Sequence, residues 1–129
     1  FPSYLEQGED HYAFADLLPP VRLNVALFEW VIENLCKNAI DAMGGAGTLT
    51  ISVQETSRFW HIDVADTGKG IDKRNFETVF APGYTTKKRG WGLGLSLARR
   101  IVVEYHSGRI FVKQSEINKG TIFRIELKK

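Results

Sequence analysis

Two alternating segments joined by a short polar connection occupy residues 48–66 of the chain, TLTISVQETSRFWHIDVAD. Apolar side chains fall at every second position of each segment. They are Leu49, Ile51 and Val53 in the first segment, then Trp60, Ile62 and Val64 in the second. This period of two on both sides of a short polar linker is typical of a hairpin with one face against a core. The sequence therefore predicts paired strands over 48–53 and 59–66.

A helix is predicted before this hairpin, over residues 24–43. Asn24 is a suitable N-cap, and the glycine pair at 44–45 would end the helix. At about 100° per residue, the apolar side chains share one arc that we expect to cover the sheet. The arc contains Phe28, Ile32, Leu35, Ala39, Ala42 and Met43.

Outside this central block, the patterns predict further elements. They are an edge strand at 11–18, a turn at 66–70, a short helix at 73–79, a loop at 80–91, a helix at 92–105 and strands at 109–113 and 121–127. The apolar face of the second helix is expected at Leu93, Leu97, Ile101 and Tyr105. Adjacent paired strands favour an α+β class over a doubly wound parallel sheet. We expect a two-layer α/β sandwich, with helices on one face of a mixed, mostly antiparallel sheet.

Length and composition limit the class of protein. A chain of 129 residues with 43% hydrophobic and 25% charged residues suits one globular domain. We expect this domain at 11–129, with 1–10 as a linker. A net charge of +2 is too small to indicate a nucleic-acid partner, and no apolar run approaches the roughly 18 residues of a membrane span. The single cysteine fits a reducing compartment.

A polar line borders the apolar arc of the first helix. Asn34 and Asn38 are four residues apart and Asp41 follows three later, so all three share one side of the helix. An amide oxygen is a hard, neutral ligand that suits Mg²⁺ when a nucleotide supplies other oxygens. The alternative is that these residues bond to a neighbouring loop.

Two polar residues have the strand parity of the core face. Asp66 follows Trp60, Ile62 and Val64 in register, and a buried carboxylate needs a partner such as an exocyclic amine. It could instead bond the backbone of its own Asp-Thr-Gly turn. Thr121 shares parity with the apolar residues of the last strand and could meet the same ligand, or simply bond to backbone.

Alternating glycines open the second helix, at residues 90–95, GWGLGL, after the basic cluster 87–89. Free N–H groups and the helix dipole at such a position favour phosphate, although a flexible hinge is an alternative. The spacing matches neither a P-loop nor a dinucleotide-binding fingerprint.

Together these motifs resemble those of histidine kinase catalytic domains, whose superfamily includes heat-shock chaperone ATPases, type II topoisomerases and mismatch-repair ATPases. Five stretches carry the resemblance: the N box at 34–42 (NLCKNAIDA), the first G box at 66–71 (DTGKGI), the F box at 76–80 (FETVF), the second G box at 90–95, and a last-strand motif at 119–123 (KGTIF). The resemblance covers most of the chain and implies a Bergerat-type ATP-binding fold.

The resemblance also implies roles around a bound base and its metal ion. Asn38 would hold Mg²⁺ through its amide oxygen, and Asn34 would support the phosphates or a metal-bound water. Asp66 would accept a hydrogen bond from the adenine amine with help from Thr121. The turn residues that would pass close to the base are Gly68, Gly70 and Ile71.

Around the phosphates, the second G box would offer backbone N–H groups, and Lys87 or Lys88 could reach the γ-phosphate from a mobile lid over 80–91. The glycine-rich residues concerned are Gly90, Gly92, Leu93 and Gly94. Asp41 belongs to the same candidate site, but family members often carry a basic or aromatic residue there or one position later. Base stacking and charge neutralisation must then come from elsewhere.

A sensor histidine kinase of this family transfers the γ-phosphoryl group of ATP to a histidine, usually followed by Glu or Asp, on a two-helix dimerisation domain. Here the histidines are His11, His61 and His106, followed by Tyr, Ile and Ser. The resemblance therefore implies a cytoplasmic catalytic domain without its acceptor, linked through 1–10 to a dimerisation domain of a dimeric parent. A response regulator would act downstream, and no membrane contact by this domain is expected.

Two alternatives remain within the superfamily. One is an anti-sigma-type serine kinase, and the other is a non-catalytic module that binds ATP and changes partners. The intact Asn38 and the full glycine set weigh against the second.

Overall fold

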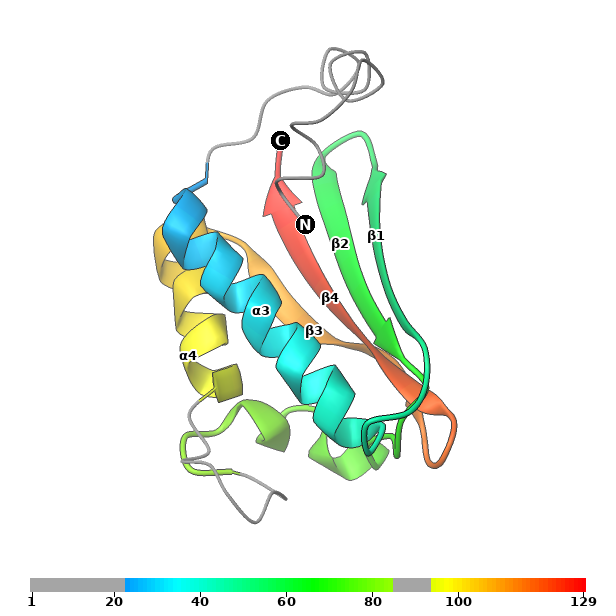
Figure 1. Ribbon diagram of the computed structural model, residues 1–129. Coiled ribbons are helices and arrows are strands. Elements are labelled where there is room, and N and C mark those ends of the chain that lie inside the picture. The colour runs from blue at the N-terminus through cyan, green and yellow to red at the C-terminus, as the bar shows by residue number, and fades with distance from the viewer. Residues whose placement is uncertain (1–22, 85–93) are drawn as a thin grey trace.

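The computed structural model describes residues 23–84 and 94–129 (Figure 1). The described elements are α3 (Val25–Ala42), β1 (Leu49–Glu55), β2 (Phe59–Asp66), the 3₁₀ turns η1 (Lys73–Asn75) and η2 (Thr78–Phe80), α4 (Gly94–Arg100) with its π-helical continuation η3 (Ile101–Tyr105), β3 (Arg109–Glu116) and β4 (Gly120–Lys128). The predicted strand at 11–18 and the linker at 1–10 lie outside the described residues.

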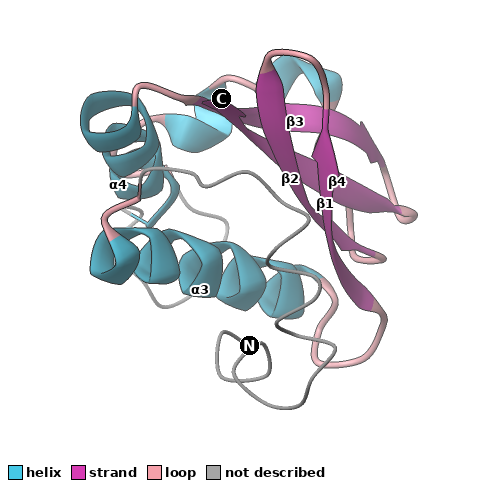
Figure 2. Ribbon diagram, turned by 90° about the horizontal axis from the view of Figure 1, so that it is seen from above, coloured by secondary structure: helices cyan, strands magenta, loops and turns pink. Residues whose placement is uncertain are grey.

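The four described strands form one sheet in the order β1-β2-β4-β3, and every neighbouring pair is antiparallel. Helices α3 and α4 lie on one side of this sheet (Figure 2). The predicted α+β sandwich and the predicted hairpin of β1 and β2 are confirmed. In the hairpin, Leu49 pairs with Asp66 and Ile51 with Val64, so the alternating apolar residues share the helix side.

The core lies between α3 and the sheet. The largest fully buried side chains are Phe123, Leu35, Ile125, Val31, Val64 and Val102. Four members of the predicted arc of α3 are buried, and its last two, Ala42 and Met43, are partly buried. Asn24 caps the helix as predicted, because its side chain accepts a hydrogen bond from the Leu27 N–H at 3.1 Å.

The predicted apolar face of the second helix is correct at Ile101 and wrong at Leu97 and Tyr105. Ile101 is buried together with Ala98 and Val102, whereas Leu97 is 40% exposed and Tyr105 is 64% exposed. Leu93 lies outside the described residues. The helix carries more apolar side chains than one face can hold, so spacing alone could not choose among them. The buried residues are those that lie against α3 and the sheet. The wider π-helical turn of η3 also changes which residues face the core after Arg100.

The short helix predicted at 73–79 is replaced by the two separate turns η1 and η2. Asp72 caps the first turn by accepting from the Arg74 N–H at 2.9 Å. Val79 and Phe80 are both buried, so the chain turns inward after Glu77 rather than continuing as a surface helix.

His106 joins the two helices. Its Nε2 accepts a hydrogen bond from the Asn24 N–H at 3.0 Å, and its Nδ1 lies 3.0 Å from the Ile101 carbonyl oxygen. The backbone N–H can only donate and the carbonyl can only accept, so the ring is neutral with its hydrogen on Nδ1. The end of η3 thereby holds the start of α3.

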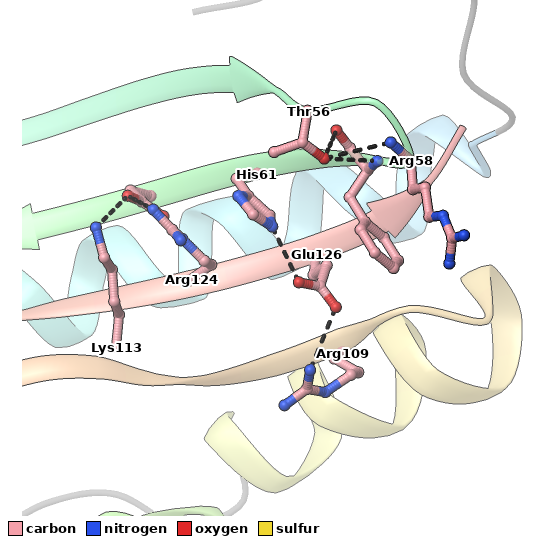
Figure 3. Close-up of polar contacts among 9 residues, drawn as sticks. Thr56, Arg58, His61, Arg109, Lys113, Arg124 and Glu126 are labelled. Carbon is pink, nitrogen blue, oxygen red and sulfur yellow. Dashed lines mark hydrogen bonds and ion pairs between the residues drawn. The ribbon is translucent and has the colours of Figure 1, made fainter.

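On the other side of the sheet, a row of ion pairs crosses the strands (Figure 3). His61 lies 2.9 Å from Glu126, which also pairs with Arg109 at 3.3 Å. Both described histidines therefore contact neighbouring elements. Among the helices of residues 23–84 and 94–129, none is long and apolar enough to cross a bilayer.

Candidate functional site

The candidate residues gather at one end of the molecule. The C-terminal end of α3, the end of β2, the start of β4 and the first turn of α4 all lie at the lower end of Figure 1. The C-terminus of α3 and the turn after β2 are bonded directly, because the Lys69 N–H donates to the Ala42 carbonyl at 2.9 Å. Residues from four separate stretches of sequence therefore come together here.

The polar line of α3 occupies the predicted border of its buried arc. Asn34 and Asn38 are partly buried and Asp41 is exposed. The apolar arc sets the rotation of α3 about its axis, so the polar line is held at the edge of the helix–sheet interface.

Asn34 contacts the start of α4. A methyl group added at Gly94 would lie 2.5 Å from the Asn34 side-chain oxygen. That distance is well inside van der Waals contact, so a side chain at this position would displace the Asn34 side chain from its present orientation. Asn34 of the N box and Gly94 of the second G box, which were predicted separately, therefore meet in space.

Asp66 ends β2 with its side chain on the helix side of the sheet, where it is 7% exposed. Its Oδ1 accepts a hydrogen bond from the Gly68 N–H at 2.8 Å. Burial raises the pKa of this carboxyl, while hydrogen bonds from the Gly68 and Thr121 backbones act in the opposite direction. The predicted inward orientation of the carboxylate is confirmed, and the carboxylate also bonds its own turn.

Thr121 lies directly opposite Asp66 in the β2–β4 register and is 3% exposed. Its hydroxyl does have a side-chain partner, because Thr121 Oγ1 lies 2.7 Å from Ser115 Oγ on β3. The predicted pairing of Asp66 and Thr121 on one face is confirmed, and Ser115 extends the row to a third strand.

The turn after β2 is packed against backbone on two sides. A methyl group at Gly68 would lie 2.5 Å from the Ala42 carbonyl oxygen. Gly70 has φ +77° and faces the backbone of Glu116 closely, so a side chain there would be both strained and blocked. Ile71, which packs against the core, donates its N–H to Ser115 Oγ at 2.7 Å.

Five predicted site residues are not placed by the structure. Lys87, Lys88, Gly90, Gly92 and Leu93 lie outside the described residues. Asn38 is partly buried and Asp41 is exposed further along α3. The other described candidates form two groups. Asn34 and Gly94 touch between the helices, and Asp66, Gly68, Gly70, Ile71 and Thr121 lie around the end of the sheet.

Sequence reasoning missed Ser115. In an unbroken strand, Ser115 would share parity with Phe111 and Lys113 and would point away from the helices. A register shift between Val112 and Gln114 reverses the parity, so Ser115 pairs with Thr121 on the helix side. No local sequence pattern predicts this bulge. Only the position of the Ser115 hydroxyl, a few residues before the KGT motif, could have suggested a contact with Thr121.

Comparisons with known proteins identify the family of this chain. A family model described as "Histidine kinase-, DNA gyrase B-, and HSP90-like ATPase" matches residues 24–129. The chain belongs to this family. The match includes every predicted motif, from the asparagine line of α3 to the KGT segment at the start of β4.

Within the family, similar proteins include several histidine kinases. The sensor histidine kinase ZraS of Escherichia coli is 38% identical over 112 residues, covering 87% of this chain and 24% of ZraS. The nucleotide-free catalytic domain of histidine kinase ThkA has a TM-score of 0.74 at 33% identity, over 84% of this chain and 71% of that one. ThkA in complex with the response regulator protein TrrA matches at 30% identity, with a TM-score of 0.71.

The chain spans about a quarter of the length of the curated relatives it matches, 24% in the case of ZraS. Its fold matches that of the catalytic domain of ThkA. The histidine kinase resemblance seen in the sequence is thereby confirmed.

Proposed function

We propose that this domain binds Mg·ATP and transfers the γ-phosphoryl group to a histidine on a separate dimerisation domain. One observation carries the proposal: a buried carboxylate, Asp66, faces the helix side of the sheet beside Thr121, at the end of the molecule where the turn after β2 is bonded to the C-terminal end of α3. A buried carboxylate is costly unless a donor satisfies it, and the adenine amine is such a donor.

The base would lie against the turn after β2. Gly68 and Gly70 let that turn pack closely against the backbones of Ala42 and Glu116, and Ile71 continues it with an apolar side chain. These features suit a flat ring system that is gripped at one edge by Asp66 and Thr121.

The phosphates would lie between α3 and α4. Backbone N–H groups from Gly90, Gly92, Leu93 and Gly94 would bind them, and Lys87 or Lys88 would approach the γ-phosphate. Asn34 is already in contact with Gly94, which supports a shared role beside the phosphates. Asp41, the exposed end of the polar line, would lie at the rim.

The magnesium ion would be held by the amide oxygen of Asn38 together with phosphate oxygens. The donor set fits this ion, since amide and phosphate oxygens are hard ligands. When bound, Mg²⁺ would neutralise charge on the transferring phosphoryl group, and the protein would supply position and N–H donors.

The acceptor would come from another domain. His61 and His106 are engaged with Glu126 and with Asn24 and Ile101, and neither is followed by an acidic residue. Residues 11–129 would form the catalytic domain, and residues 1–10 would link it to the dimerisation helices of a dimeric parent. A response regulator would receive the phosphoryl group afterwards.

Calorimetric titration of Mg·ATP tests the binding step. Asp66→Asn keeps the acceptor oxygen for Gly68 but turns a carboxylate into an amide, so ATP affinity should fall by roughly tenfold or more, as expected for a hydrogen bond to a charged group. Asp72→Asn, six residues later and exposed, is the matched control and should bind as wild type. Equal affinities for wild type and Asp66→Asn would contradict the assignment.

A phosphotransfer assay separates the alternatives. The domain is mixed with a histidine-bearing dimerisation helix pair or with a serine-bearing protein substrate. Acid-labile phosphohistidine supports the proposal, and phosphoserine supports the anti-sigma-type kinase. ATP binding without transfer to either substrate supports the non-catalytic module.

A further inference from the structure

The Ser115 hydroxyl has three polar neighbours at the end of the sheet. Its Oγ lies 2.7 Å from the Ile71 nitrogen, 3.1 Å from the Gly120 carbonyl oxygen and 2.7 Å from Thr121 Oγ1. It thus links the end of the Asp66–Gly70 turn, the start of β4 and Thr121. The binding role assigned to Asp66 and Thr121 above does not account for this arrangement.

The number of available hydrogens determines which atom donates in each of these three contacts. A serine hydroxyl has one hydrogen and two acceptor positions. The Ile71 N–H can only donate and the Gly120 carbonyl can only accept, so the serine hydrogen goes to Gly120. The second acceptor position then takes the Thr121 hydroxyl hydrogen, and all three contacts are satisfied together.

This direction determines what Thr121 can offer to a ligand. With its hydrogen committed to Ser115, Thr121 Oγ1 presents only lone pairs, and the neighbouring Asp66 carboxylate is also an acceptor. Two adjacent acceptors match a group with N–H or O–H donors, such as an exocyclic amine or a water that donates to both. They repel a carbonyl oxygen at the same place.

We propose that Ser115 is a positioning residue for nucleobase selectivity, which holds the Thr121 hydroxyl as an acceptor so that the site prefers a 6-amino purine to a 6-oxo purine. The inference rests on the proposed ATP-binding function and extends it to the choice of base. Without Ser115, the Thr121 hydrogen could rotate and donate to a 6-oxo group.

The test compares the affinities of the full 129-residue chain for Mg·ATP and for the inosine triphosphate complex, by calorimetry. Ser115→Ala should reduce the ATP-to-inosine-triphosphate affinity ratio by roughly tenfold, the effect of one reoriented hydrogen bond. Ser115→Thr keeps the hydroxyl, so its ATP-to-inosine-triphosphate affinity ratio should be close to that of wild type. Ser52→Ala is the matched control, since Ser52 pairs with Asp63 on the other side of the same sheet and should leave the ratio unchanged.

The ratio separates positioning from a merely structural role. If Ser115→Ala weakens both nucleotides equally, Ser115 only supports the turn and the proposal is overturned. Equal affinities in wild type overturn the two-acceptor arrangement while leaving ATP binding intact. Binding of neither nucleotide overturns the proposed function and this inference with it. Should Ser115→Ala fail to fold, Ser115→Cys, whose sulfur is a weak acceptor, provides the same comparison.

Discussion

Arg124 and Asp63 form a bidentate ion pair between β4 and β2, with Nε–Oδ1 and Nη2–Oδ2 distances of 2.8 and 2.9 Å. The two side chains are 14% and 10% exposed, although they lie on the sheet face opposite the helices. The hydrogen bonds to Asp63 raise the pKa of Arg124. The pair therefore joins the two central strands on the side that the hydrophobic core does not reach.

Removing the arginine should destabilise the fold. Arg124→Ala leaves a largely buried carboxylate with fewer donors, so the free energy of unfolding should fall by about 1–3 kcal/mol in urea denaturation. Arg74→Ala is the matched control, because Arg74 pairs with Asp72 through two similar contacts but is 87% exposed. Its urea midpoint should change much less, because an exposed ion pair contributes little to stability. An equal loss in both variants would contradict a special role for the buried pair.

Asp66 should make stability depend on pH. Its folded-state pKa is raised by burial, so the folded chain holds the proton more tightly than the unfolded chain. The stability that the protonated Asp66 contributes is fully present below the pKa of the unfolded state. It is lost as the pH rises through the pKa of the folded state. As the pH rises from about 4, near an ordinary Asp pKa, to about 7, the unfolding free energy of Asp66→Asn should increase relative to that of wild type. Urea denaturation at each pH measures this difference.

Asp72 provides a control of opposite sign. Hydrogen bonds from Arg74, first from its side chain and then from its backbone, lower the pKa of Asp72. Its contribution is present above the unfolded value and is lost as pH falls through the folded value. Asp72→Asn should therefore have a lower unfolding free energy than wild type at neutral pH, and this difference should shrink as the pH falls. If Asp66→Asn showed the same trend, burial would not be the dominant influence on Asp66.

Gly94→Ala should weaken Mg·ATP binding more than it weakens the fold. Alanine is a better helix former than glycine by about 1 kcal/mol, which offsets the cost of turning Asn34 away from the new methyl group. The displaced Asn34 should lower Mg·ATP affinity by roughly tenfold, the effect of losing one hydrogen-bonding group. Thermal melting and calorimetry measure the two effects separately.

A double-mutant cycle tests whether the effect passes through Asn34. In an Asn34→Ala background, Gly94→Ala should cause no further loss of affinity, because the side chain that it displaces is already absent. Additive losses in the double variant would mean that Gly94 acts on the nucleotide independently of Asn34.

His106→Ala should loosen the junction of the two helices. The change leaves the Asn24 N–H without its acceptor, removes a donor from the Ile101 carbonyl and deletes an edge contact with Phe28. We expect a loss of about 1–2 kcal/mol in unfolding free energy. Tyr105→Ala, at an exposed neighbouring position, should have a much smaller effect. Similar losses in the two variants would contradict the bridging role.

Several elements followed from local sequence pattern. The hairpin at β1 and β2, the Asn24 cap and the buried arc of α3 are each specified by side-chain period and by residues close in the chain. Asp66 and Thr121 were predicted on the helix side for the same reason, because parity within a single strand is a local property. The glycine spacing and the polar line likewise pointed to a nucleotide site before any contact was known.

Other features required contacts between distant residues. Spacing could not choose the buried stripe of α4, since Leu97 and Ala98 were both suitable and packing against α3 selected the smaller residue. The bulge after Val112 turned Ser115 towards Thr121, and the closeness of Gly94 to Asn34 joined segments some sixty residues apart. The periodicity of a helix and the alternation of a strand are determined by neighbouring residues in the chain. Which helix face contacts which strand face depends on how the helices and strands pack around one core.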